Sequence, residues 1–191
     1  MWRTIAILVI IIAVVVGIAI FSGNKEAPGD NNKPINQATI MNKLTLTSLE
    51  FESGGSIPSK YTCDGRNINP PLQISGVSER TKSLALIMDD PDAKPVAGKV
   101  WDHWLVWNIP ASTTEIIEGR EPEGIHGKGT SGNTDYYGPC PPDKEHTYYF
   151  KLYALDVELE LEAGSNKQEL ENIMDGHILD QAILTAHYEK Q

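Results

Sequence analysis

The sequence is short of positive charge. Its 191 residues include 16 lysines and arginines against 26 aspartates and glutamates, a formal net charge of −10 at pH 7. An acidic chain repels phosphate backbones, so the composition argues against nucleic acid as a partner. The charged share of 22% and the hydrophobic share of 40% are those of a folded domain. The length suffices for one ordinary domain.

The sequence also lacks the short motifs of common catalytic and zinc sites. No G-x-S-x-G motif or catalytic Cys–His signature stands out. Neither C-x-x-C nor H-x-x-x-H spacing is present, which argues against zinc. The two cysteines, Cys63 and Cys140, could form one disulfide in an exported domain, or they could be two separate buried thiols. We therefore expect a protein that is not an enzyme and needs no metal or cofactor.

A long apolar run occurs near the start of the chain, where residues 5–21 contain no charged or strongly polar side chain. As a helix, this run would span roughly 25 Å, slightly less than a bilayer core of about 30 Å. Arg3 precedes it and favours a start inside the cell. No A-x-A cleavage site follows, so residues 1–23 are predicted to be a membrane anchor. A cleaved signal segment and a buried helix are the alternatives.

The remaining chain divides into a linker and a folded domain. Residues 22–37 are rich in glycine, proline, asparagine and charge, so residues 24–41 are predicted to be flexible, and residues 42–191 to be folded. Strand signals dominate the folded part. Residues 44–51 alternate, residues 83–89 form a short apolar run, and residues 103–109 and 147–156 are rich in aromatic and β-branched side chains.

Helical signals are confined to the end of the sequence. Ser165 and Gln168 have the spacing of a capping box, and Gly176 would end the helix that they begin. A second short helix is predicted over residues 177–183. The sequence therefore predicts a mainly β domain, largely antiparallel, with a few late helices.

Three pairs of side chains have the two-residue spacing that places them on one side of an extended chain. The pairs are Asp90 with Asp92, Trp101 with His103, and His146 with Tyr148. If the strand ends that carry them meet, one pocket collects carboxylates, imidazoles, an indole and a phenol. Two plainer interpretations stay open: Asp-Pro-Asp is a good turn sequence, and a lone histidine on a strand is more often a core residue. Trp104 is predicted to face away from His103, into the core.

Five separated motifs occur in order along the chain: IPSKYTCDGRNINPPLQISGV, DDPDA, WDHWLVWNIP, YYGPCPPDKEHTYYFKLYALD and DGHILDQAILTAHYEK. Together they resemble the phosphatidylethanolamine-binding protein family, and in particular its prokaryotic, Raf-kinase-inhibitor-like branch. The resemblance covers roughly residues 44–188. It implies a large antiparallel sheet packed on a smaller one, with short helices near the C-terminus.

The resemblance also implies a small pocket for anions such as phosphate and for phosphorylated head groups. Carried over by motif, its ligand-binding residues are Asp90, Asp92, Trp101, His103, Pro141, Pro142, His146 and Tyr148. The loops of Cys63 and Cys140 would lie side by side, which favours the disulfide. The sequence departs from many relatives at two places. Lys94 stands between an alanine and a proline that are adjacent in those relatives, and Asp143 and Lys144 stand where those relatives have a small residue and a glycine.

Carboxylates beside an anion require an explanation. A neighbouring carboxylate favours the imidazolium form of a histidine. We therefore expect the aspartates to raise the pKa values of His103 and His146, which would then donate hydrogen bonds to phosphate oxygens. The hydroxyl group of Tyr148 would add a neutral donor.

The resulting hypothesis is an exported binding protein for a small anionic or phospholipid-head-group ligand. It would be tethered to the membrane, or secreted if the first segment is cleaved. One alternative is an inhibitor or regulator of a protein partner, because eukaryotic members of the resembled family inhibit kinases and proteases. A less favoured alternative is an enzyme or metal site that uses Asp90, Asp92 and His103.

Overall fold

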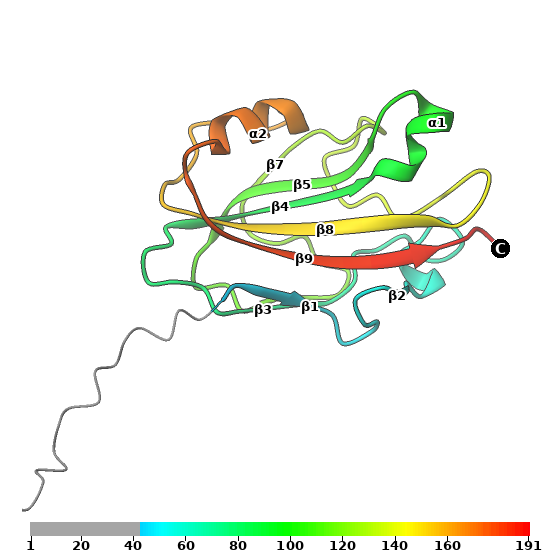
Figure 1. Ribbon diagram of the computed structural model, residues 1–191, viewed down its shortest axis with the longest axis horizontal. Helices are drawn as coiled ribbons and strands as arrows, with labels where there is room; N and C mark the ends of the chain where they lie inside the picture. Colours follow the sequence, from blue (N-terminus) through cyan, green and yellow to red (C-terminus); the bar gives the residue numbers. More distant parts are fainter. Residues whose placement is uncertain (1–42) are drawn as a thin grey trace, which may run out of the picture. The chain divides into compact units, whose positions relative to one another are not determined.

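The computed structural model describes residues 43–191, which form two β-sheets and a few short helices (Figure 1). The predicted anchor or signal segment, residues 1–23, and the predicted linker, residues 24–41, lie outside the described residues. Within residues 43–191, no helix is both long enough and apolar enough to cross a membrane.

The large sheet has six strands in the order β2-β9-β8-β4-β5-β7, and the small sheet has three in the order β1-β3-β6. The strands are β1 Thr45–Thr47, β2 Gly55–Ser56, β3 Leu72–Ser75, β4 Ser83–Asp90, β5 Trp101–Pro110, β6 Glu115–Ile116, β7 Ile125–His126, β8 His146–Leu155 and β9 Ile178–Tyr188. Neighbouring strands are antiparallel except β2 and β9, which run parallel. The predicted mainly β fold with a large and a small sheet is confirmed.

Strand β4 lies inside the large sheet, and all of its residues are buried. Leu86 belongs to a core cluster that includes Leu72 of the small sheet, whereas Ile87 packs in a second cluster with Leu170 of α2 (Lys167–Met174). Figure 1 shows the small sheet on one side of the large sheet and α2 on the other. This two-sided cover explains why the β4 sequence is apolar without alternation.

Helix α2 is the predicted late helix, but its cap lies one residue further along than predicted. The Asn166 side chain accepts a hydrogen bond from the Glu169 backbone N–H, and the Glu169 carboxylate accepts one from the Asn166 N–H. Asn166 and Glu169 therefore form the capping box, rather than Ser165 and Gln168. An acidic group in the first turn also suits the positive end of the helix dipole.

The prediction of a second short helix over residues 177–183 is wrong: His177 lies in the turn before β9, and residues 178–183 belong to β9. Strand β9 pairs with β8 along nearly its whole length. Alternate β9 side chains, among them Leu184 and Ala186, are buried on the core face. Pairing with a long neighbouring strand outweighs the weak local preference of this segment.

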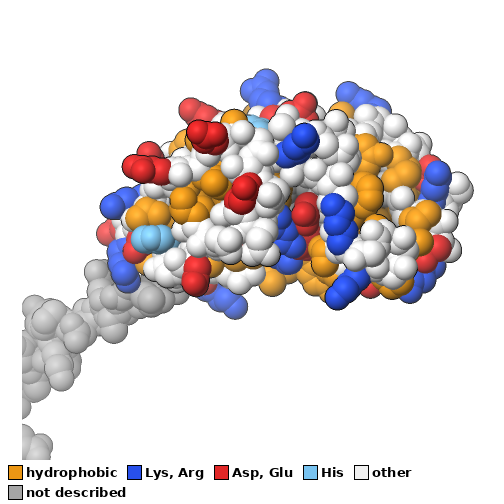
Figure 2. Space-filling view, turned by 90° about the horizontal axis from the view of Figure 1, so that it is seen from above, with side chains coloured by type: hydrophobic (Ala, Val, Ile, Leu, Met, Phe, Trp, Pro, Cys, Tyr) orange, Lys and Arg blue, Asp and Glu red, His pale blue; other side chains and the backbone are white. Residues whose placement is uncertain are grey.

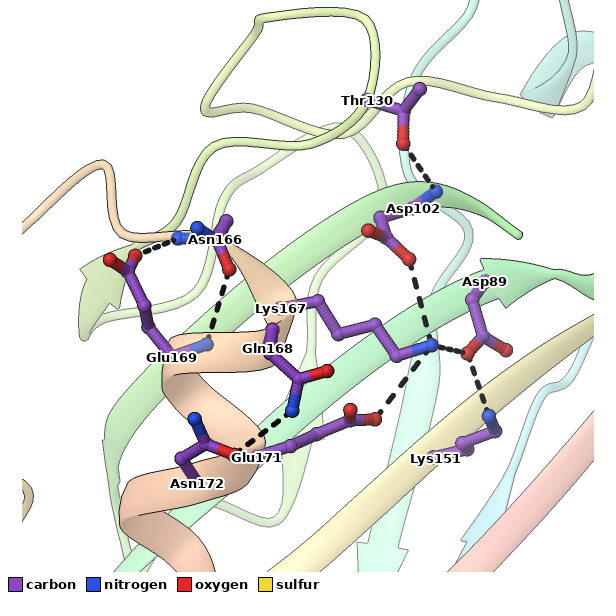
Figure 3. A network of polar contacts seen from close by, with 10 residues as sticks. All are labelled: Asp89, Asp102, Thr130, Lys151, Asn166, Lys167, Gln168, Glu169, Glu171 and Asn172. Carbon is purple, nitrogen blue, oxygen red and sulfur yellow. Dashed lines mark hydrogen bonds and ion pairs between the residues drawn. The ribbon is translucent and has the colours of Figure 1, made fainter. Parts of the chain in front are cut away.

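Charged side chains attach α2 to the large sheet (Figure 3). The Nζ atom of Lys167 contacts the carboxylate of Asp89 and lies 3.6 Å from Asp102 Oδ1 and 3.7 Å from Glu171 Oε1. Lys151 Nζ lies 2.7 Å from the same Asp89 carboxylate, whose side chain is 1% exposed. Two cations therefore compensate one buried anion, which is the arrangement that a buried charge requires.

The surface above α2 carries charges of both signs. Figure 2 shows acidic and basic side chains interspersed with hydrophobic ones on this face. Nearby charges of opposite sign partly cancel each other's field, so the face shown offers little long-range attraction to a polyanion.

Candidate functional site

A cavity of about 380 Å³ opens where β4 ends and where β5 and β8 begin. Its size is within the range of small-molecule sites. The 3₁₀ turn Pro91–Ala93 and the short helix α1 (Lys94–Ala97) stand beside it, at the same end of the sheet (Figure 1). The lining residues are Asp90, Ala93, Val96, Ala97, Trp101, His103, Tyr137, Cys140, Pro141, Pro142, His146 and Tyr148.

The cavity brings together the predicted ligand-binding residues, except Asp92. The Asp92 carboxylate instead accepts a hydrogen bond of 2.8 Å from the Thr147 backbone N–H, which ties the turn to the start of β8. Sequence reasoning missed the wall formed by Ala93, Val96 and Ala97. These small apolar residues carry no chemical signal in the sequence, and their place follows from the turn that precedes them.

A β-bulge sets the position of His103. Met88 pairs with Trp104 and Asp89 pairs with Asp102, so His103 has no partner on β4. The extra residue breaks the alternation of side chains along β5. His103 contacts Tyr148, which shares a core cluster with Trp104. Trp104 is a core residue as predicted, but it does not face away from His103, because alternation fails at the bulge.

His103 is buried and presents a nitrogen without a protein partner. Its Nδ1 atom lies 2.5 Å from the carbonyl oxygen of Tyr137, so Nδ1 carries the hydrogen and donates it. Its Nε2 atom has no partner among the described residues. Burial lowers the pKa of His103 below the ordinary 6.5, despite the Tyr137 carbonyl and Asp90. The expected increase of this pKa is therefore wrong: near neutral pH the ring is uncharged, and Nε2 is an acceptor.

Tyr148 supplies the complementary group. Its ring meets that of His103 edge to face at a centroid distance of 5.3 Å. The hydroxyl group is buried and has no hydrogen-bond partner among the described residues. Burial, followed by the charges of Asp90 and Asp92, raises the pKa of Tyr148 well above its ordinary value. The hydroxyl therefore keeps its hydrogen and can donate it.

Asp90 and His146 are already engaged with protein groups. Asp90 Oδ1 accepts a hydrogen bond from the Ala93 N–H at 3.1 Å, and Oδ2 lies 2.7 Å from His146 Nδ1. His146 Nε2 lies 2.9 Å from Asp143 Oδ1. Across residues 43–191, no group of three or more histidine, cysteine or acidic side chains is arranged to hold a metal ion.

Cys63 and Cys140 form a disulfide at the rim of the cavity, with an S–S distance of 2.10 Å and a Cα–Cα distance of 5.4 Å. Cys140 lines the cavity together with Pro141 and Pro142, which follow it. The structure thus favours the disulfide over two separate thiols. The bond holds the segment that carries the proline rim.

The stability of the domain should depend on pH through His103. Between the lowered pKa and 6.5, the unfolded chain binds more protons at this residue than the folded chain. The contribution of His103 to the free energy of unfolding should therefore rise with pH through this window and level off above about 6.5. Urea unfolding of the wild type and of His103→Asn, which keeps a donor near the Tyr137 carbonyl, measures it. An unchanged pH slope in the variant would contradict the assignment.

The domain is similar to a family of known proteins. A family model described as phosphatidylethanolamine-binding protein matches residues 47–189. A UPF0098 protein of Methanothermobacter thermautotrophicus is 47% identical over 153 residues, which cover 77% of this chain and 99% of the relative. A UPF0098 protein of Chlamydia trachomatis is 44% identical over 149 residues, with the same coverage of both chains.

Two solved structures are also similar. The phosphatidylethanolamine-binding protein homolog CT736 of Chlamydia trachomatis matches with a TM-score of 0.75 and 43% identity, over 78% of this chain and 99% of its own. YbcL of E. coli, described as a member of the mammalian PEBP family, matches with a TM-score of 0.72 and 32% identity, over the same shares.

Proposed function

The chain belongs to the phosphatidylethanolamine-binding protein family, and from this premise we propose that it binds a small phosphate monoester in the cavity at the ends of β4, β5 and β8. The observation that supports the proposal is a pair of buried polar atoms, His103 Nε2 and the Tyr148 hydroxyl oxygen. Neither has a partner among residues 43–191, and both residues line the cavity. Buried polar groups are normally hydrogen-bonded, so a ligand that completes both is expected.

The two atoms define the chemistry of the ligand. Neutral His103 requires a hydrogen-bond donor at Nε2, and the Tyr148 hydroxyl requires an acceptor. A phosphate monoester that retains one hydrogen offers both, through its P–O–H group and a bare oxygen. Its single charge also meets less repulsion from the carboxylate of Asp90 than a dianion would.

The walls suit the rest of such a molecule. Val96, Pro141 and Pro142 are apolar lining residues that can contact carbon atoms of the ester. The indole of Trp101 is half-buried in the same lining, and the face of an indole attracts cations. A phosphoethanolamine group, which joins a phosphate to an ammonium, is therefore a suitable probe.

The lining favours binding over catalysis. Covalent catalysis requires a nucleophile beside a base. The lining of the described cavity contains no serine, threonine or free thiol, its Cys140 is held in the disulfide, and the raised pKa of Tyr148 keeps that hydroxyl protonated. Asp90 uses both carboxylate oxygens within the protein, so it is not a free general base.

Removing the Tyr148 hydroxyl should weaken binding of phosphoethanolamine. Tyr148→Phe keeps the ring that packs on His103 and deletes the donor to the phosphate oxygen. We expect an affinity loss of about tenfold or more, because a hydrogen bond to a charged group contributes about 1.5–3 kcal/mol. Isothermal titration calorimetry on the described domain measures the loss.

Tyr149→Phe is the matched control for this test. It deletes a hydroxyl at the next position of β8, where the side chain does not line the cavity. This control should bind phosphoethanolamine as the wild type does. Equal affinities for all three proteins, or no binding by the wild type, would remove the proposed function.

We also propose that the domain is exported and remains tethered by the apolar run of residues 5–21. The disulfide supports export, because such bonds persist mainly in oxidising compartments. Full-length protein should stay with membranes after a carbonate wash, whereas a chain that starts near Asn42 should be soluble. Recovery of a shortened mature chain outside the membrane fraction would indicate a cleaved signal instead.

A further inference from the structure

His146 is held at both ring nitrogens by carboxylates. Nδ1 lies 2.7 Å from Asp90 Oδ2, and Nε2 lies 2.9 Å from Asp143 Oδ1. A carboxylate accepts hydrogen bonds, so each nitrogen presents a hydrogen to its partner. The His146 side chain is fully buried, although it lines the cavity. It therefore has no free N–H to offer a ligand.

The two carboxylates occupy different places. The Asp90 side chain is 4% exposed and forms part of the cavity lining, whereas the Asp143 side chain is 42% exposed. Asp143 follows Pro142 of the rim directly in the chain. Asp143 therefore covers the Nε2 atom of buried His146 from an exposed position in the loop. An exposed side chain in a loop can move aside, but buried Asp90 cannot.

We propose that Asp143 is a specificity-determining residue: it acts as an attached competitor that withholds the His146 N–H from fully deprotonated anions. The inference rests on the proposed function and adds a ligand preference to it. An anion without its own hydrogen, such as a sulfate ester, cannot satisfy His103 Nε2 and needs the His146 N–H. It must displace Asp143 to reach it. A phosphate monoester that retains a hydrogen binds through His103 and Tyr148 and leaves Asp143 in place.

The charge around His146 acts in the same direction. Asp90 and Asp143 place two carboxylates beside His146, so a further full anion at this wall meets repulsion. Replacing Asp143 by alanine removes both the competing acceptor and its charge. The cavity should then accept sulfate esters more readily.

Two probes that share the same ammonium tail test the proposal: phosphoethanolamine and its sulfate counterpart, 2-aminoethyl hydrogen sulfate. At pH 6, about half of a phosphate monoester retains its hydrogen, whereas the sulfate ester retains none. Calorimetry should show that wild-type protein binds the sulfate at least about tenfold more weakly. In Asp143→Ala, the affinity for the sulfate should rise about tenfold, and that for the phosphate by less than about threefold.

Glu145→Ala is the matched control, because it removes an equal charge from the same loop at an exposed position that has no hydrogen bond to His146. It should change both affinities by less than about twofold, in keeping with the small effect of an exposed charge. The ¹⁵N shift of His146 Nε2 reports in each protein whether Asp143 holds that nitrogen.

The outcomes separate this inference from the proposed function. Suppose that wild-type protein binds phosphoethanolamine and that Tyr148→Phe weakens this binding, so that the proposed function holds. If Asp143→Ala then raises the sulfate affinity no more than Glu145→Ala does, only the competitor role of Asp143 is overturned. If Asp143→Ala raises both affinities equally, Asp143 does not determine specificity. If no probe binds to any variant, the proposed function and this inference both fall.

Discussion

Replacement of Lys167 by methionine is expected to lower the free energy of unfolding by about 3 kcal/mol, because it leaves a buried carboxylate without one of its cations. Asp89 is 1% exposed, and its Oδ2 atom receives both Lys167 and Lys151 (Figure 3). Burial alone would lower the pKa of Lys167, but contact with Asp89 outweighs it and raises the pKa. Lys167 is therefore charged at neutral pH. Methionine retains the apolar stem and removes only the charge.

The matched control is Lys82→Met, which changes an exposed lysine directly before β4 that has no ion pair within residues 43–191. It should change stability by less than about 0.5 kcal/mol in urea unfolding. Adding Asp89→Asn to Lys167→Met should cost less than the sum of the two single changes, since both remove the same pair. Additive losses, or a Lys167→Met loss as small as the control, would show that the network contributes little.

This network lies directly behind the cavity. Asp89 precedes the lining residue Asp90 on β4, and Asp102 lies between Trp101 and His103 on β5. Adjacent strand residues point to opposite faces, so the charges that attach α2 and the groups that line the cavity share the same strand ends. The sequence motif DDPDA therefore serves two purposes, and the spacing of acidic residues alone could not separate them.

Local periodicity predicted a mainly β domain and placed some of the cavity residues together, whereas the two-sheet arrangement and the full set of ligand-binding residues were implied by the family resemblance. Residues two apart on a strand share a face, and this held for His146 and Tyr148 on β8, where both line the cavity. The short apolar run of residues 83–89 likewise predicted a buried strand, which is β4. These inferences need only local periodicity, which the fold preserves wherever strands are regular.

The sequence predictions fail where contacts between distant parts of the chain determine the local structure. The bulge at His103 depends on its pairing with β4, and its lowered pKa depends on the depth of burial. Neither quantity has a signature in the local sequence. The strand over residues 178–183 was missed because its pairing partner, β8, is separated from it in the chain by α2 and two loops. The contact of Asp143 with His146 requires a loop conformation that no motif specifies.

Loss of the Cys63–Cys140 disulfide should cost the domain about 4 kcal/mol, because the bond closes a loop between residues 77 apart. Other contacts help to join these loops: the Cys63 N–H donates to the Pro139 carbonyl at 3.0 Å, and the Gly138 N–H donates to Asn67 Oδ1 at 2.8 Å. Gly138 fits there because an added Cβ would lie 2.2 Å from the Tyr61 carbonyl oxygen. We therefore expect the fold to form without the bond, but with lower stability.

The double variant Cys63→Ser/Cys140→Ser, unfolded in urea beside oxidised and reduced wild-type protein, measures this effect. If the cross-link itself stabilises the fold, the reduced wild type and the double variant should lose similar amounts, since the first keeps both sulfur atoms and the second has none. A large loss in the double variant but not in the reduced wild type would assign the effect to sulfur packing instead.

Thiol labelling under denaturing, non-reducing conditions should find no free thiol in protein recovered from its own compartment. Two labelled cysteines there would contradict both the bond and the export that it supports, because a reducing compartment keeps such pairs open.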